Sequence, residues 1–262
     1  MIKLVATDLD GTVVPEGTAD IHPDFYNLIR KLKAKGITFV AASGREFDTM
    51  KTVMGPVQED IYFITNNGAR IIEHGERELL RLSIDWKDTC DIIKYVRGLD
   101  NIFYAVNTPE GTLVDRRDEE ILDLLKNGYK LRYHMVDDIL ESPIDNLKVS
   151  LYVRSDAAKA AEPIKELFGE RVNVTAAGAH WVDFIHKDAD KGRTLEILMD
   201  RLGIEKEECW SFGDNYNDIS LIKAAGTGFS APGAREGVCE AADVCLEGDL
   251  KSAVYDRLCT LL

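Results

Sequence analysis

Short apolar runs near the start of the chain each end at small or polar residues. Residues 1–6, 37–42 and 61–65 form three such runs, and runs of this kind are typical of strands buried on both faces of a parallel sheet. Apolar residues at helical spacing predict a helix over residues 23–35, and a second helix is predicted through Val53. Strands that alternate with helices in this way predict a doubly wound, Rossmann-like α/β sheet that is mostly parallel.

The pattern changes in the middle of the chain, where helices are interleaved with hairpins. We predict helices over residues 86–97, 118–126 and 157–168, a strand over 147–154, and hairpins that pair 102–107 with 112–115 and 172–176 with 180–185, the latter around Ala177-Gly178. This arrangement predicts a separate α+β module with a partly antiparallel sheet.

The opening pattern returns after the α+β module. It predicts helices over residues 190–202, through Ala225 and over 250–261, and strands over 209–212 and 226–230. We therefore expect a discontinuous α/β domain made of residues 1–82 and 189–262, with the α+β module, residues 83–188, inserted into it.

Carboxylates follow two of the predicted strands of the discontinuous domain. Asp8 and Asp10 follow the first strand, and Asp214 and Asp218 follow the strand over residues 209–212. Active sites of open parallel sheets lie beyond the carboxyl ends of the strands, and neighbouring carboxylates repel one another unless a cation neutralises them. Hard oxygen ligands of this kind favour Mg²⁺, and one such carboxylate can act as a nucleophile that forms an aspartyl-phosphate.

Ser43 and Lys191 complement these carboxylates. Ser43 ends the second predicted strand and can hydrogen-bond phosphoryl oxygens, while Lys191 begins a predicted helix and can neutralise a nucleophile and a phosphate. Structural alternatives stay open, since Ser43 also suits a helix cap and Asp218 suits the first turn of a helix. The Gly/Pro/Thr-rich residues 11–20 are interpreted as a hairpin flap over the site.

Composition limits the partners of this chain. Its 32 Lys and Arg against 46 Asp and Glu give a net charge of -14, which argues against a long nucleic-acid footprint. No apolar run approaches the ~18 residues needed to span a bilayer, and no signal-like segment is present, so we expect a cytoplasmic protein without a membrane partner. The five cysteines include no C-x-x-C pair and are interpreted as reduced.

Four motifs occur in order along the chain: Asp8-Leu9-Asp10-Gly11-Thr12, Ser43-Gly44-Arg45, Asp190-Lys191-Gly192 and Gly213-Asp214-Asn215-Tyr216-Asn217-Asp218. Together they resemble the motifs of the haloacid dehalogenase-like superfamily, and more closely its Cof-type branch of sugar-phosphate phosphatases. That branch carries a cap domain between the second and third motifs, where this chain inserts its α+β module. The resemblance implies a Mg²⁺-dependent phosphoric monoester hydrolase acting on small phosphorylated metabolites, expected to be sugar (hexose) phosphates.

The resemblance also implies roles for individual residues. Asp8 would be the nucleophile, Asp10 the general acid/base, and Ser43 and Lys191 the further catalytic residues, which bind phosphate. Mg²⁺ would be held by Asp8, by the backbone carbonyl of Asp10 and by Asp214, with Asp218 as a ligand or as the holder of a metal-bound water.

Further residues are expected on the substrate side, namely Gly44, Arg45, Asn67 and Asp183. Arg45 suits an ordinary first helical turn equally well, and Asp183 suits a solvated strand face. Relatives usually have Gly-Asn-Ala where this chain has Pro232-Gly233-Ala234, so one polar contact near the site is expected to be missing.

Other functions share parts of this pattern. A phosphomutase, the alternative we keep, would use the same aspartyl-phosphate but return the phosphoryl group to the sugar. A signalling receiver also combines clustered Asp, Ser or Thr, Lys and Mg²⁺, but such chains are much shorter and lack an inserted module. A ligand-binding relative without activity would be expected to have lost Asp8, Asp10, Lys191 or Asp214. We expect a monomer, with a dimer as the alternative.

Overall fold

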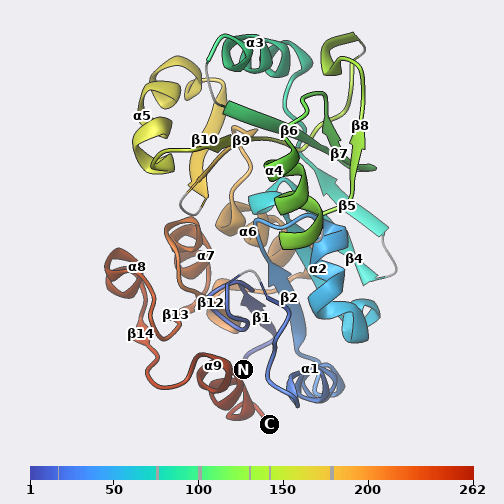
Figure 1. The fold of residues 1–262 in the computed structure, drawn as a ribbon. Coiled ribbons are helices and arrows are strands. Elements are labelled where there is room, and N and C mark those ends of the chain that lie inside the picture. The colour runs from blue at the N-terminus through green and yellow to red at the C-terminus, as the bar shows by residue number, and fades with distance from the viewer. Residues whose placement is uncertain (17, 75–76, 100–101, 130, 142, 178–179) are drawn as a thin grey trace. The chain divides into compact units, whose positions relative to one another are not determined.

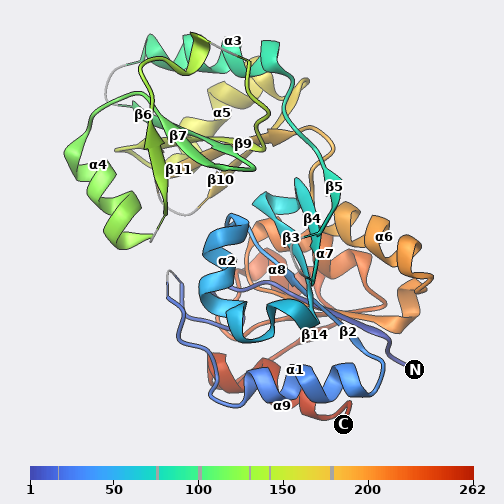
Figure 2. The same cartoon turned by 90° about the vertical axis from the view of Figure 1, so that its right-hand side faces the viewer.

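The computed structural model describes residues 1–16, 18–74, 77–99, 102–129, 131–141, 143–177 and 180–262. They form two compact units (Figures 1 and 2). The core unit consists of Met1–Leu80 together with Asp190–Leu262, and the inserted unit consists of Arg81–Ala189. Among the described residues, no helix combines the length and the apolar composition that crossing a bilayer requires.

The core unit is built on an eight-stranded sheet with the order β14-β13-β12-β1-β2-β3-β4-β5. Its strands are β1 (Leu4–Thr7), β2 (Thr38–Ala42), β3 (Tyr62–Thr65), β4 (Arg70–Glu73), β5 (Arg77–Arg81), β12 (Cys209–Gly213), β13 (Thr227–Ser230) and β14 (Val244–Cys245). The pairings from β14 to β3 are parallel, and β3 pairs with β4 in antiparallel fashion. The mostly parallel α/β sheet that the sequence predicts is thus confirmed.

Helices cover both faces of this sheet because its strands are apolar on both sides. Val5 faces the side covered by α1 (Phe25–Ala34), α2 (Phe47–Met54) and α9 (Leu250–Cys259). Its neighbours Leu4 and Ala6 face the side covered by α6 (Lys191–Leu202) and α7 (Ile219–Ala224). The short helix α8 (Glu236–Ala241) lies against α7 and β13. Successive strand residues point to opposite faces, so each strand contributes to both cores.

The inserted unit contains a six-stranded sheet with the order β10-β11-β9-β6-β7-β8. Its elements are α3 (Trp86–Arg97), β6 (Ile102–Thr108), β7 (Gly111–Val114), α4 (Glu119–Asp123), β8 (Tyr133–Met135), β9 (Lys148–Val153), α5 (Ala157–Phe168), β10 (Val172–Ala177) and β11 (Trp181–His186). The pairings are antiparallel except that β7 and β8 run parallel. The predicted α+β character is confirmed, although Gly178 of the second predicted hairpin turn lies outside the described residues.

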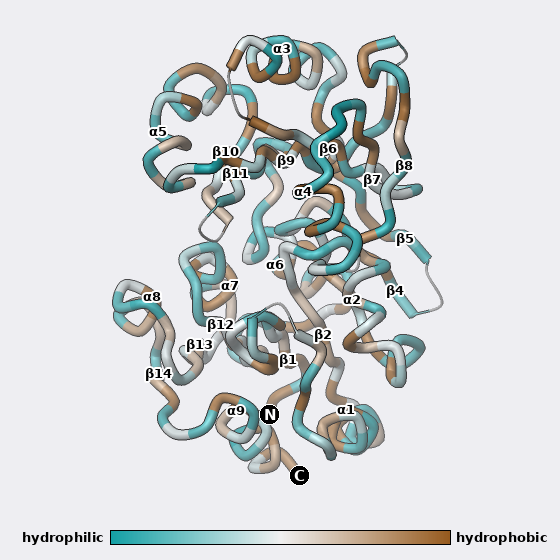
Figure 3. Tube along the Cα trace, viewed as in Figure 1, coloured by the Kyte–Doolittle hydropathy of each residue, from teal (hydrophilic) through white to brown (hydrophobic). Residues whose placement is uncertain are grey.

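One face of this sheet packs against α3 and α5, and the other face packs against α4. Amphipathic helices make both layers possible, and α3 carries both hydrophobic and hydrophilic residues (Figure 3). Asp85 caps α3 by accepting a hydrogen bond from the backbone N–H of Lys87, and Asp156 caps α5 through that of Lys159. Such caps satisfy backbone donors that the first helical turn leaves unpaired.

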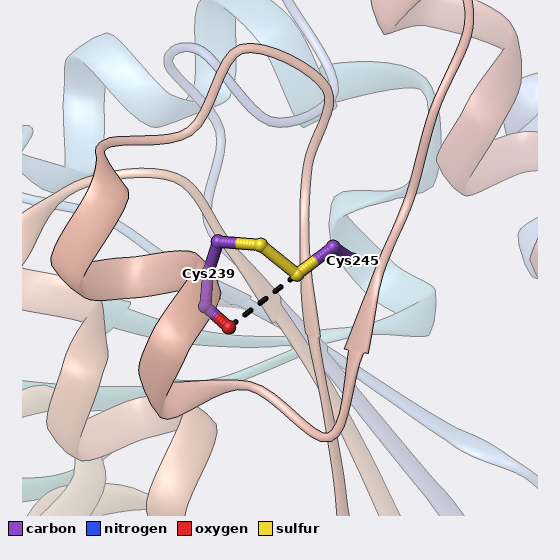
Figure 4. The surroundings of a disulfide bond; sticks show 2 residues. All are labelled: Cys239 and Cys245. Carbon is purple, nitrogen blue, oxygen red and sulfur yellow. Dashed lines mark hydrogen bonds between the residues drawn. A yellow bond between two sulfur atoms is a disulfide. The ribbon is translucent and has the colours of Figure 1, made fainter.

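Two expectations from the sequence are wrong. Cys239 in α8 and Cys245 in β14 form a disulfide (Figure 4), with their Cα atoms 5.6 Å apart, so not all five cysteines are reduced. The free cysteines are Cys90, Cys209 and Cys259. The second concerns the predicted flap over residues 11–20, whose described residues form turns and a single bridge between Asp10 and Val14 rather than a hairpin.

Candidate active site

The carboxyl ends of the parallel strands bring the four motifs together at one edge of the core sheet. Asp8 follows β1, Ser43 follows β2, Asp214 follows β12, and Lys191 is the first residue of α6. The register aligns the ends of β1 and β12, since Thr7 pairs with Phe212 and the backbone N–H of Asp8 donates to the Phe212 carbonyl at 2.9 Å. Residues far apart in the sequence therefore meet at this edge.

A buried lysine joins two of the carboxylates. Lys191 Nζ donates to Asp8 Oδ1 at 2.7 Å and to Asp218 Oδ1 at 2.6 Å. The Lys191 side chain is only 1% exposed. Asp190 fixes the start of α6 by accepting a hydrogen bond from the Arg193 N–H at 3.0 Å. A buried ammonium needs such partners, because desolvation of an unpaired charge is costly.

Asp218 uses both of its oxygens within the protein. Its Oδ1 accepts from Lys191, while Oδ2 accepts from the backbone N–H groups of Asp214 at 3.1 Å and Asn215 at 3.0 Å. The carboxylate thus holds the turn that carries Asp214 and orients Lys191. This arrangement favours a supporting role for Asp218 over direct metal ligation.

Burial shifts the proton affinities of these groups. Burial and the negative charge of Asp218 raise the pKa of Asp8 well above its ordinary value, although Lys191 acts in the opposite direction. Burial also raises the pKa of Asp214 to about 6, in spite of a hydrogen bond from Thr12. For Lys191, burial disfavours the charged form, but the carboxylates of Asp218 and Asp8 outweigh it and raise the pKa. The cluster thus combines three carboxylates with one lysine, and burial makes two of these carboxylates hold protons more readily.

The carboxylates fit a divalent metal ion. Asp8, Asp214 and Asp218 each offer one oxygen, and these three atoms lie within 4.8 Å of one another. Asp214 is oriented by Thr12, whose hydroxyl donates to Asp214 Oδ1 at 2.7 Å. Gly11 lets this carboxylate approach the backbone, because a Cβ at Gly11 would lie 2.4 Å from Asp214 Oδ2 and its φ of 78° is left-handed. Hard oxygen donors at this spacing suit Mg²⁺.

Asp10 lies beside this cluster with its side chain held by an arginine. Arg45 Nε donates to Asp10 Oδ2 at 2.7 Å, and an Nη donates to Asp10 Oδ1 at 2.5 Å, which makes a bidentate pair. The same guanidinium donates to the Thr18 carbonyl at 2.8 Å. A planar fork of this kind fixes the orientation of a carboxylate. Arg45 is therefore more than a first-turn residue, and the sequence motif alone did not indicate its partner.

The loop after β2 is held by backbone contacts. Ser43 is 2% exposed, its N–H donates to the Ile64 carbonyl at 2.9 Å, and its hydroxyl accepts from the Arg45 N–H at 3.1 Å. Gly44 lies against the side chain of Asn67, because a Cβ at Gly44 would be 2.9 Å from Asn67 Oδ1. The core unit thus brings together Asp8, Asp10, Ser43, Gly44, Arg45, Asn67, Lys191, Asp214 and Asp218.

Asp183 belongs to the inserted unit, where it is buried rather than solvated. It pairs with Ser150 across β11 and β9, and it accepts from Ser150 Oγ at 2.7 Å and from Lys148 Nζ at 3.0 Å. Lys148 and Ser150 were missed in the sequence, although their spacing of two on a strand places them on one face. Thr12 and Asn217 were not predicted as site residues either. Their positions inside the motifs were the one sequence feature that could have indicated them.

Gly233 adopts a left-handed φ of 80°, and no atom lies within 4 Å of the position that its Cβ would take. The chain departs there from the usual Gly-Asn-Ala, and the glycine suits this conformation without strain. Beside it, the Arg235 N–H donates to the Asp214 carbonyl at 3.0 Å. This segment thus supports the turn that carries Asp214 through its backbone.

Comparisons with known proteins agree with this geometry. A family model described as haloacid dehalogenase-like hydrolase matches residues 5–258. The HMP-PP phosphatase of Escherichia fergusonii is 25% identical over 239 residues, which cover 87% of this chain and 84% of that protein. Several solved structures cover all of this chain. One from Eubacterium rectale has 29% identity, a TM-score of 0.89 and 99% of its own chain covered. A haloacid dehalogenase-like hydrolase from B. subtilis has 24% identity, a TM-score of 0.86 and 100% covered.

Proposed function

The chain belongs to the haloacid dehalogenase-like hydrolases and is a phosphoric monoester hydrolase, and from that premise we propose that it cleaves small phosphorylated metabolites through a phosphoryl group carried on Asp8. The observation that carries this proposal is the buried contact of Lys191 with both Asp8 and Asp218. A nucleophilic carboxylate must keep its charge although burial opposes this, and a lysine at 2.7 Å serves that purpose.

In the proposed reaction, an oxygen of Asp8 attacks phosphorus while the bond from phosphorus to the leaving oxygen breaks. Asp10 gives its proton to that oxygen, and the aspartyl-phosphate remains on Asp8. Water then attacks the phosphorus, Asp10 takes a proton from this water, and phosphate leaves with Asp8 restored. The pair that Arg45 makes with Asp10 keeps this carboxylate in a fixed orientation. Arg45 must release one oxygen of Asp10 for the proton transfer, because both oxygens accept hydrogen bonds in the pair.

Ser43 and Lys191 are proposed to bind the phosphoryl oxygens. Asp8, Asp214 and the backbone carbonyl of Asp10 are proposed to hold Mg²⁺, with Asp218 fixing the turn that carries Asp214. When bound, Mg²⁺ neutralises charge on the phosphoryl group and the carboxylates. In phosphoryl transfer, positioning and charge neutralisation supply most of the rate. The surplus of buried carboxylates over lysine in the site supports this need for a cation.

The test is phosphate release by wild type and by Asp8→Asn, measured with p-nitrophenyl phosphate in Mg²⁺ and in excess chelator. We expect Asp8→Asn to lose turnover and to stay folded, because the amide is a poor nucleophile of nearly the same size. Exposed Asp200, in the same unit, supplies a matched control, and Asp200→Asn should keep full activity. Phosphate release by Asp8→Asn near the wild-type rate, or full wild-type activity in chelator, would overturn the proposal.

Sugar phosphates are the substrate class we propose, on the strength of the sequence motifs. A panel of sugar phosphates and HMP-PP, compared by kcat/KM, tests this choice, and a clear preference for HMP-PP would overturn it. Asp183 is proposed to act on the substrate side through the polar face that it shares with Lys148 and Ser150. A cytoplasmic location and a monomeric state stay predictions, and light scattering tests the latter.

A further inference from the structure

The turn that follows β3 is unusual in its backbone. Asn66, Asn67 and Gly68 have successive φ values of 52°, 56° and 97°, all left-handed. Among the described residues, Asn66 and Asn67 alone are non-glycine residues with positive φ, and both are buried, at 1% and 6% exposure. Asparagine tolerates this conformation better than most residues, but glycine adopts it without strain. Two buried asparagines where glycine would fit suggest that their side chains have a purpose.

The backbone of this turn holds the loop that carries Ser43. The Asn66 N–H donates to the Arg45 carbonyl at 2.9 Å, and the Asn67 N–H donates to the Ser43 carbonyl at 3.1 Å. These bonds depend on the left-handed conformation and not on the amide side chains. They fix the loop from Ser43 to Arg45, which we call the phosphate-side loop, to the end of β3.

The Asn67 side chain adds a second connection. Its Oδ1 accepts from Asn217 Nδ2 at 3.1 Å, and Asn217 lies in the turn whose last residue is Asp218. The same amide lies against Gly44, where a Cβ would come within 2.9 Å of it. One side chain thus touches the loop after β2 and the turn after β12.

Gly68 connects the turn to the helix that carries Lys191. Its carbonyl accepts from Thr194 Oγ1 at 2.7 Å. A Cβ at Gly68 would lie 2.5 Å from the backbone of Asp190, the residue before Lys191. The three residues therefore contact the segments that carry Ser43, Asp218 and Lys191, although they supply no charged group.

We propose that Asn67 is a positioning residue, whose amide sets the spacing between the phosphate-side loop at Ser43 and the metal-side turn at Asn217 and Asp218. The inference rests on the proposed function and deepens it. Loss of the amide would let the two segments move relative to each other without unfolding the unit. Phosphoryl transfer is sensitive to such displacement, since a shift of ~1 Å can cost about 10²-fold in rate.

A double-mutant cycle with Asn67→Gly and Asn217→Ala tests this, with p-nitrophenyl phosphate as substrate and saturating Mg²⁺. Asn67→Gly keeps the left-handed turn and removes the amide, so the free energy of unfolding in urea should fall by no more than the ~1 kcal/mol of one buried hydrogen bond, roughly a fivefold change in the unfolding equilibrium. We expect each single variant to lower kcat roughly 10- to 100-fold with KM changed less than about threefold. The double variant should be no slower than the slower single one, because both remove the same connection.

Asn66→Gly is the matched control, because it alters the neighbouring left-handed residue, whose side chain contacts Thr65 Oγ1 and not Asn217. It should retain kcat within about threefold. Asn67→Gly at the wild-type rate, or losses that simply multiply in the double variant, would overturn the inference while leaving the proposed function intact. A wild-type protein that released no phosphate would overturn the proposed function and, with it, the catalytic role of Asn67.

Discussion

Replacing Lys191 by methionine would leave two buried carboxylates without their common partner. Asp8 and Asp218 each lose a charge-assisted hydrogen bond, and the side chains of the three residues are 1% to 7% exposed. Methionine matches the lysine stem in length and fills the same space. The variant therefore removes the charge and little packing.

Removing one partner of a buried ion pair costs about 3–5 kcal/mol. We expect Lys191→Met to lower the free energy of unfolding by about this amount at pH 7.5 in the absence of metal. The loss should shrink toward pH 5. Burial and the negative charge of Asp218 already raise the pKa of Asp8, and the lysine that opposes them is gone in this variant. A group whose pKa is raised in the folded state contributes stability at low pH that disappears as the pH rises. The rate of phosphate release should fall by at least ~10²-fold, since a charge beside Asp8, the proposed nucleophile, is lost.

Urea unfolding of the metal-free protein at pH 5 and 7.5 measures the effect, with exposed Lys223→Met in the same unit as a control. Lys191→Met combined with Asp218→Asn should recover part of the loss, because one of the two uncompensated charges is gone. A Lys191→Met variant within about 1 kcal/mol of wild type at both pH values would refute the buried cluster as described.

Three further predictions concern the same unit. The free energy of unfolding of the metal-free protein should fall by on the order of 2 kcal/mol between pH 4 and 7.5. The pKa of Asp214 is raised to about 6, so the stability that protonated Asp214 contributes is lost as the pH rises through that value. Asp214→Asn should flatten this dependence of stability on pH, and Mg²⁺ should offset the loss. Arg45→Gln should lower kcat roughly 10-fold or more for alkyl phosphates and less for aryl phosphates. A good leaving group depends less on an oriented Asp10, so equal losses of kcat for the two kinds of substrate would contradict this prediction. Thiol titration of denatured, unreduced protein should find three thiols, because Cys239 and Cys245 are joined. Reduction of this disulfide should lower the free energy of unfolding by roughly 2 kcal/mol, since the loop that it closes is short. A count of five thiols would exclude the disulfide.

The central part of the fold could be predicted because its strands are apolar on both faces and stop at polar residues. Asp8 and Ser43 are placed by that rule alone, since parallel strands deliver their carboxyl ends to one edge. The polar edge of the core sheet could not be predicted in this way. Strands β4 and β5 carry charged residues such as Arg70 and Glu78, which pair with each other, and their alternation resembles an exposed loop.

Side-chain partners were harder to predict than strand positions. The sequence identified Asp218 and Arg45, but their roles depend on which atoms they meet. Asp218 lies 27 residues from Lys191, and both of its carboxylate oxygens accept hydrogen bonds from other residues of the protein. The spacing of the motifs does not reveal these contacts. The Asn66-Asn67-Gly68 turn carried a local signal, because asparagine and glycine favour left-handed backbone. Its connection to Asn217 is visible only in three dimensions.

The core unit takes its central strands from parts of the chain that lie on either side of the inserted unit. Strand β1 lies between β2, which is translated soon after it, and β12, which is translated last of the three. Lys191 leaves the ribosome 183 residues after Asp8, which corresponds to roughly 10–40 s at typical translation rates. The contiguous inserted unit can fold during that interval, while the half-sheet of β1 to β3 awaits its partner. A nascent chain therefore gains the buried partner of Asp8 only after the whole inserted unit has been synthesised.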